Sequence, residues 1–150
     1  MDASNDYPRV TTGDGYAVAH YDDLGEGPGF RKVRRGLGVN AFGVNVIVMP
    51  PGIDSGFHYH DEQEELYFIH RGTVEMEFGD GSVHRLSEGS MARVDPATVR
   101  KLRNVGDVDV VYLCAGGKEG YVGRDGRLPP GEEHTVAALH RPSAAPPPVE

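Results

Sequence analysis

Several residue types and patterns are scarce or absent in this 150-residue chain. Trp does not occur and Cys114 is the single cysteine, which excludes an internal disulfide, a zinc ribbon and a CxxC redox site. No apolar run approaches the roughly 18 residues of a membrane-spanning helix. Residues 1–20 lack the basic start and apolar stretch of a secretory signal. We therefore expect a cytoplasmic protein that has no membrane partner.

Positive charge is also scarce. Lys and Arg together number 15 against 23 Asp and Glu, which gives a formal net charge of -8. Proteins that bind nucleic acids need basic patches to neutralise phosphates. Here the dense basic clusters, at residues 31–35 and 100–103, are short and belong to an acidic chain. Nucleic acid is therefore not an expected partner.

Glycine and proline are abundant, with 21 and 11 residues. Such frequent breakers leave little room for long helices and suit short strands joined by turns. Residues 73–78 alternate strictly, with Val74, Met76 and Phe78 on one face, as in a half-buried strand. About eight strands of this kind, roughly 8–12 residues apart, fit residues 39–115. The pattern predicts an all-β, single-domain antiparallel sandwich or barrel.

The segments on either side of this domain read differently. Residues 1–38 are expected to be an N-terminal arm and loop, in which the glycine-rich stretch 22–38 forms a long ordered loop. Residues 116–140 form a loop-rich C-terminal extension. The Pro/Ala-rich residues 141–150 are expected to be a disordered tail. The β-domain itself is predicted to span residues 39–115.

A group of metal-ligating residue types lies within the β-domain. His58 and His60 are two residues apart, so on a strand both imidazoles point to the same face. Glu65 lies on the next expected strand, and a hairpin-like return brings its carboxylate opposite that pair. Two histidines and one carboxylate can hold a divalent transition metal and leave positions open for a substrate. The alternative is two ordinary strand histidines beside a solvated acidic corner.

The spacing of these residues resembles a known family. The first motif of the cupin superfamily is resembled in full register by Gly52, His58, His60, Glu65 and Gly72. The gaps between these residues are five, one, four and six residues. The resemblance implies a small single-domain cupin with a jelly-roll barrel. It also implies that His58, His60 and Glu65 are metal ligands.

A second cupin motif is matched less completely. Gly81, Ser87, Gly89 and Asn104 resemble it, although Ser87 stands where proline is usual. Arg100 stands where the family's fourth ligand, a histidine, is expected. Because a guanidinium only donates hydrogen bonds, Arg100 cannot ligate a cation. The expected centre therefore has three protein ligands, and a metal-free cupin is the alternative.

Three interpretations of Arg100 follow. It binds a carboxylate or enolate of a metal-bound substrate, it pairs with a nearby glutamate and fills the vacated space, or the register slips so that Val99 faces inward and Arg100 faces solvent. Tyr67 is expected to share the inward face with Glu65. It orients a substrate, serves as a proton donor, or is an ordinary core tyrosine. Arg100 and Tyr67 are thus the candidate catalytic residues.

The resemblance implies a small metalloenzyme, such as a dioxygenase, isomerase or decarboxylase. Its substrate would be a small oxygen-bearing molecule, neutral or anionic: a keto acid, a diketone or a phenolic compound. Imidazole and carboxylate ligands suit Fe, Mn, Ni, Zn or Cu. A non-catalytic cupin that binds a small molecule or sugar is the first alternative, and a structural role in assembly is the second. Exposed strand edges would favour a homodimer.

Overall fold

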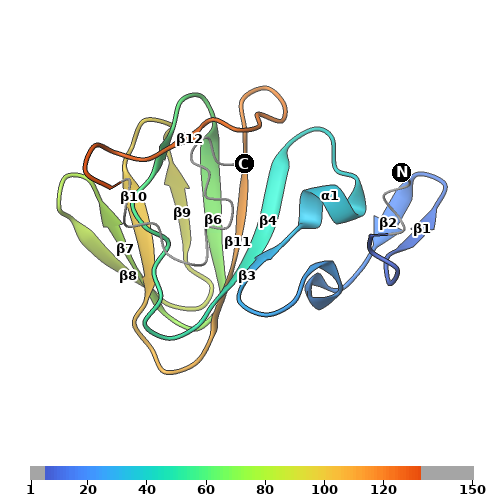
Figure 1. Cartoon of the computed structure of the whole chain (residues 1–150), viewed down its shortest axis with the longest axis horizontal. Helices are drawn as coiled ribbons and strands as arrows, with labels where there is room; N and C mark the ends of the chain where they lie inside the picture. Colours follow the sequence, from blue (N-terminus) through green and yellow to red (C-terminus); the bar gives the residue numbers. More distant parts are fainter. Residues whose placement is uncertain (1–5, 133–150) are drawn as a thin grey trace.

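The computed structural model describes residues 6–132, and its regular elements are almost all β-strands. The larger sheet contains five strands, in the order β3 (Gly29–Arg31), β4 (Gly43–Met49), β11 (Val110–Gly117), β6 (Glu64–Arg71) and β9 (Met91–Val94). The smaller sheet contains three, in the order β10 (Arg100–Asn104), β7 (Val74–Phe78) and β8 (Val83–Leu86). Figure 1 shows the smaller sheet on the left and the larger sheet to its right.

Short elements complete the described chain. Two further pairs of strands are β1 (Thr11–Gly13) with β2 (Tyr16–Val18) and β5 (Tyr59–His60) with β12 (Gly126–Arg127). The helical elements are η2 (Tyr21–Leu24) and α1 (Val33–Leu37). Within residues 6–132 no helix is long and apolar enough to cross a membrane.

The prediction of an antiparallel all-β fold is confirmed, because every strand pairing is antiparallel. The prediction of a closed barrel is not confirmed. In the described part of the chain the strands form separate sheets, and β9 and β8 end theirs without pairing to each other. The larger and the smaller sheet are joined by side-chain packing rather than by a continuous ladder of hydrogen bonds. The arrangement is consistent with a jelly roll built as an open sandwich.

The main core lies between the two large sheets. Its buried members come from both: Ile47, Met49, Tyr67, Ile69, Val74, Met76, Val94, Leu102, Val110 and Tyr112. Val74 and Met76 point into this core as the alternation in residues 73–78 predicted, whereas Phe78 at the strand end is half-buried. Ile69 and Leu102 are completely buried, one from each sheet.

Strand β4 is apolar on both faces, and the structure explains why. Ile47 faces the main core, while Val46 and Val48 face the opposite side. There they pack against Tyr21 of η2 and Val33 of α1. This strand, Gly43–Met49, is one of the strands expected within residues 39–115.

The expectation of a long loop at residues 22–38 is wrong. This stretch contains the end of η2, the strand β3 and the helix α1. Helix α1 is five residues long, too short to show an apolar period. It ends at Leu37 and is followed by Gly38 in the left-handed conformation, with φ 76°. Strand β3 exists because it pairs with β4, which is a tertiary effect.

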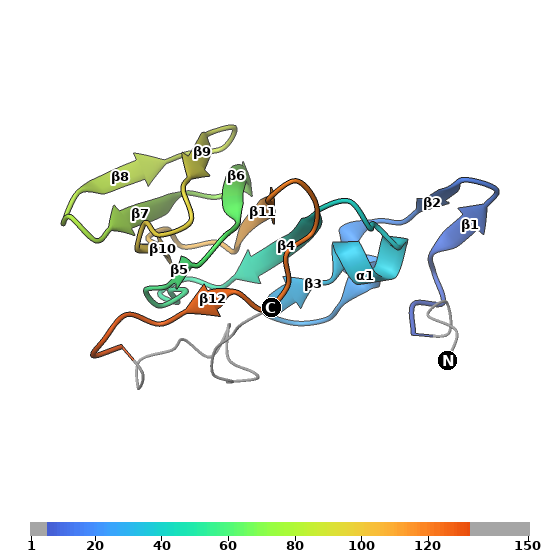
Figure 2. The same ribbon diagram turned by 90° about the horizontal axis from the view of Figure 1, so that it is seen from above.

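The C-terminal extension is loop-rich as far as the structure describes it, up to residue 132. The extension returns across the domain so that β12 pairs with β5. Figure 2 shows these two strands side by side. The tail at residues 141–150 lies outside the described residues. The division of the chain at residues 38, 115 and 140 stays a prediction.

Candidate metal centre

The three expected ligands come from two neighbouring segments. The backbone of His58 exchanges hydrogen bonds with that of Arg100, at 3.0 and 2.9 Å, so this segment runs beside β10. His60 follows on β5, where its backbone N–H donates to Pro96 O at 2.8 Å. Glu65 lies on β6 and points inward with Tyr67. The strand alternation that the sequence predicted therefore places both imidazoles and the carboxylate on one site.

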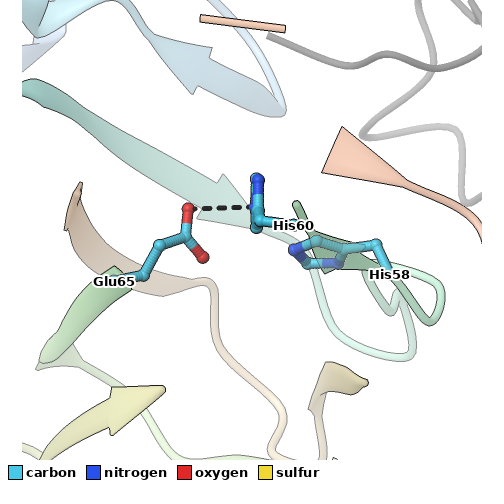
Figure 3. Close-up of side chains that lie close together, drawn as sticks. All are labelled: His58, His60 and Glu65. Carbon is cyan, nitrogen blue, oxygen red and sulfur yellow. Dashed lines mark ion pairs between the residues drawn. The ribbon is translucent and has the colours of Figure 1, made fainter. Parts of the chain in front are cut away.

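The ligand atoms of His58, His60 and Glu65 lie within 4.8 Å of one another. Figure 3 shows the side chains converging, with His60 between the other two, and its Nε2 lies 3.3 Å from Glu65 Oε2. The two imidazole rings are nearly perpendicular, at 85°. Atoms that are each about 2.1 Å from one ion lie at most about 4.2 Å apart, so small side-chain adjustments bring these three onto one ion.

Arg100 lies against this group and is fully buried, with 0% exposure. Its Nη2 donates to Glu65 Oε1 at 2.7 Å and its Nε donates to the Tyr67 hydroxyl at 3.3 Å. Its Nη1 donates to the Thr98 carbonyl at 2.6 Å. Each nitrogen of the guanidinium therefore has a partner within the protein.

These contacts test two of the three interpretations of Arg100, the register slip and the pairing with a glutamate. The register slip is wrong, because Arg100 pairs with Phe78 in the smaller sheet and its side chain faces inward. The pairing with a glutamate is what the structure contains, and the partner is Glu65. A substrate-binding role stays a prediction, since it requires Arg100 to exchange one of its present partners for the substrate.

Tyr67 is buried and its hydroxyl is fully engaged. It donates to Glu65 Oε1 at 2.6 Å and accepts from Arg100 Nε. Burial and the charge of Glu65 raise the pKa of Tyr67 well above its ordinary value, so the phenol keeps its proton. This geometry is that of a core tyrosine with a satisfied hydroxyl, and a catalytic role for Tyr67 stays a prediction.

The two oxygens of Glu65 have different surroundings. Tyr67 and Arg100 hold Oε1, whereas Oε2 faces the imidazole of His60. Burial would raise the pKa of Glu65, but the hydrogen bond and charge of His60 and the charge of Arg100 outweigh it and keep that pKa well below its usual value. Glu65 is therefore an ionised carboxylate with one oxygen fixed and the other directed at the histidines.

Asp125 also belongs to this site, and sequence reasoning missed it. Its Oδ1 lies 2.8 Å from His60 Nδ1, although 65 residues separate the two in the sequence. Burial would raise the pKa of Asp125, but hydrogen bonds from the Gln63 side chain and from the backbone of Glu62 and Gln63 lower it. A single aspartate in a glycine-rich segment carries no pattern that marks it as part of a site.

The contacts of His60 indicate what the site can hold. An ionised Asp125 only accepts, so His60 Nδ1 carries the proton and, in the neutral ring, Nε2 presents a lone pair to Glu65 Oε2. Two acceptors 3.3 Å apart repel unless a cation or a proton lies between them. Burial lowers the pKa of His60, but the hydrogen bond and charge of Glu65 raise it overall, so a proton fills this role when no metal does. The donor set thus fits a divalent transition metal.

An open antiparallel β-sandwich with a His-His-Glu group on its inner face defines the class of this protein, and sequence comparison supplies the family. Residues 45–116 match the family described as "Cupin domain", so this region of the chain belongs to the cupin superfamily. The His-His-Glu group of this cupin is positioned to bind a metal ion. No curated protein matches the chain.

Solved structures share the fold. A cupin protein from Bacteroides fragilis is 22% identical with a TM-score of 0.60, over 71% of this chain and 86% of that one. A Klebsiella pneumoniae protein with a double-stranded β-helix domain is 19% identical with a TM-score of 0.57, over 68% and 90%. A DMSP lyase from Ruegeria pomeroyi is 25% identical with a TM-score of 0.51, over 59% of this chain but 43% of the lyase. This chain therefore spans less than half of that enzyme's length.

Proposed function

We propose that this cupin is a metal-dependent enzyme that acts on a small, oxygen-bearing, anionic substrate. The observation that carries the proposal is the set of ligand atoms of His58, His60 and Glu65 within 4.8 Å of one another. These residues would hold a divalent ion, one of Fe, Mn, Ni, Zn or Cu. Such an ion supplies Lewis acidity toward oxygen atoms of a substrate or, if it is iron, reactivity with O₂.

The charges around the site support an anionic substrate. Glu65 and Asp125 are ionised, and Arg100 contributes one positive charge that pairs directly with Glu65. A divalent ion added to these three groups leaves the centre with a net positive charge. A carboxylate or enolate would neutralise that charge, as in a keto acid, a diketone or a phenolic compound.

The chain's own residues prepare the centre in this proposal. Arg100 and Tyr67 fix Glu65 Oε1 and so orient the carboxylate that binds the ion. Arg100 or Tyr67 would also bind the substrate directly if the substrate displaced one of the residue's present hydrogen-bond partners. Dioxygenase, isomerase and decarboxylase chemistry all begin from a substrate bound through oxygen. The DMSP lyase neighbour adds a lyase reaction to these candidates.

The test is turnover by protein loaded with one metal at a time. Protein stripped with a chelator is reloaded with each of the five ions and assayed against panels of keto acids, diketones and phenols, with oxygen uptake recorded. We expect one ion to support turnover that Glu65→Gln abolishes and that Glu64→Gln, on the outward face of β6, retains. Activity that is independent of added metal, or equal loss in both variants, would contradict the proposal.

A non-catalytic small-molecule-binding cupin is the second candidate. The observation that favours it is Arg100, which stands in place of a fourth ligand and uses each of its nitrogens within the protein. A fixed positive charge beside the site suits binding of an anion without a metal. In that case small carboxylates or sugar acids would raise the melting temperature of the metal-free protein, and added metal would not.

We also propose that the protein is a homodimer. Strand β9 ends the five-stranded sheet, and Met91 on it is 59% exposed. Leu66 on the neighbouring strand is 41% exposed. An open edge beside exposed apolar side chains favours pairing with a second copy. Light scattering coupled to size-exclusion chromatography gives the oligomeric state, and Met91→Lys is expected to shift a dimer toward monomer.

A further inference from the structure

We infer that Asp125 is a positioning residue that fixes the tautomer and the orientation of His60, so that a segment outside the matched cupin domain completes the metal centre. Asp125 lies beyond residues 45–116, on the C-terminal extension. The inference rests on the proposed function, since positioning of His60 matters most when His60 binds a metal.

The carboxylate of Asp125 is held rigidly. It is 5% exposed, and its Oδ2 accepts from the backbone N–H groups of Glu62 and Gln63 at 2.8 and 2.9 Å. Its Oδ1 accepts from Gln63 Nε2 at 2.6 Å and contacts His60 Nδ1 at 2.8 Å. Asp125 therefore binds the turn between β5 and β6, which is the turn that joins His60 to Glu65.

The segment that carries Asp125 is itself fixed beside β5. The backbone N–H of Asp61 donates to Asp125 O at 3.0 Å, and Gly126 pairs with His60 in the β5–β12 ladder. An ion pair of 2.8 Å between Arg127 Nη2 and Asp61 Oδ2 joins the same two segments without touching His60. Figure 2 shows β12 running next to β5. This second link offers a matched control for the effect of Asp125.

The chemistry of the contact gives it a function. A carboxylate that accepts from one nitrogen of an imidazole keeps the proton on that nitrogen and leaves the other nitrogen to bind a metal. Here the proton stays on Nδ1, and Nε2 is the nitrogen that lies 3.3 Å from Glu65 Oε2. Loss of such an outer partner usually weakens metal binding by about 10–100-fold. Asp125 would thus act on the metal through His60.

The experiment compares Asp125→Asn with Asp61→Asn. Nitrogen-15 NMR of labelled histidine reports the tautomer of His60 in metal-free protein, at a pH where the ring is neutral, with the His60 signal assigned by its loss in His60→Gln. Zn²⁺ affinity is measured on the same proteins by competition with a chelator. Circular dichroism confirms that each variant is folded.

We expect the wild type and Asp61→Asn to carry the proton on Nδ1 of His60 and to bind Zn²⁺ equally. Asp125→Asn should lose this tautomer preference and bind Zn²⁺ about 10–100-fold more weakly. An unchanged tautomer in Asp125→Asn, or the same changes in Asp61→Asn, would overturn the inference. If the wild type shows the fixed tautomer but binds no Zn²⁺, the proposed metal function fails while the positioning of His60 by Asp125 stands.

Discussion

Arg100 Nη2 lies 2.7 Å from Glu65 Oε1, and the two side chains form a buried ion pair beside the candidate metal ligands. The guanidinium occupies the sequence position at which the cupin motif has its fourth ligand. It holds one oxygen of Glu65 and leaves the other to face His60. The pair therefore shapes the site, and the loss of either partner alone would leave a buried charge uncompensated.

Removing the charge of Arg100 is expected to destabilise the protein strongly. Arg100→Gln leaves buried Glu65 without the guanidinium that pairs with its Oε1, which typically costs about 3–5 kcal/mol of unfolding free energy. Arg103 is the matched control, because it lies on the same strand and pairs with Glu75 at 3.1 Å, but its side chain is 52% exposed. Arg103→Gln should cost about 0–1 kcal/mol. Urea unfolding measures both, and equal losses would contradict the role of the buried pair.

Arg100→His is expected to strengthen metal binding. The substitution removes a positive charge near the ion and offers an imidazole where the cupin motif has one. Removing a like charge from within a few Å of a cation is worth about 1 kcal/mol or more, which corresponds to roughly fivefold or more in affinity. Competition with a chelator measures the change for Zn²⁺. Weaker binding in a folded variant would show that Arg100 supports the ligands more than its charge opposes the ion.

The metal-free protein should lose stability as the pH falls through the acid range. The pKa of Glu65 is lower in the folded than in the unfolded state, so its contribution is present above the ordinary value near 4.5 and is lost as the pH falls through the lowered value. Glu65→Gln should be less stable than the wild type at neutral pH and should show a shallower loss of stability below pH 4.5. Urea unfolding at a series of pH values tests this, and parallel curves would contradict it.

The same protein should also lose stability as the pH rises from neutrality. The pKa of His60 is higher in the folded than in the unfolded state, so its contribution is fully present below about 6.5 and is lost as the pH rises through the raised value. His60→Gln should remove this slope. The measurement is made with a chelator present, because a bound metal would replace the proton. A wild-type curve that is flat above pH 6.5 would contradict the raised pKa.

Gly116 allows β11 to pass close to the site. A Cβ at this position would lie 2.5 Å from Gln63 Oε1, 2.8 Å from the Glu64 carbonyl and 3.0 Å from Glu65 Cγ. Gly116→Ala should therefore shift Glu65 and cost about 1–3 kcal/mol of unfolding free energy. At Gly106 the nearest atom to an added Cβ would be 3.7 Å away, so Gly106→Ala is the control and should cost less. Equal thermal shifts in the two variants would contradict this account.

The ligand group could be predicted from the sequence because its information is local. His58 and His60 are two residues apart along one extended segment, and a short turn leads to Glu65. The inward position of Arg100 is also implied by alternation through Leu102, which is fully buried, although charged neighbours obscure the pattern.

Other features depend on tertiary contacts that the sequence does not display. Asp125 reaches His60 from 65 residues away, through pairing of two-residue strands. The helix α1 is too short for an apolar period, so its packing through Val33 onto Val46 and Val48 of β4 is not visible in its own sequence. The two sheets form a sandwich rather than a barrel because hydrogen bonding between edge strands, and not the alternation within strands, decides closure.

The metal content of the protein tests the central claim most directly. The experiment uses chelator-stripped protein, as wild type, His58→Ala, His60→Ala, Glu65→Gln and Glu64→Gln. Each protein is equilibrated with a small excess of Zn²⁺, freed of unbound ion and analysed for metal per chain. We predict one bound ion per chain in the wild type and in Glu64→Gln, close to none in either histidine variant, and a large loss in Glu65→Gln. Unchanged metal in both histidine variants, or equal losses in the two glutamate variants, would contradict a metal centre at these three side chains.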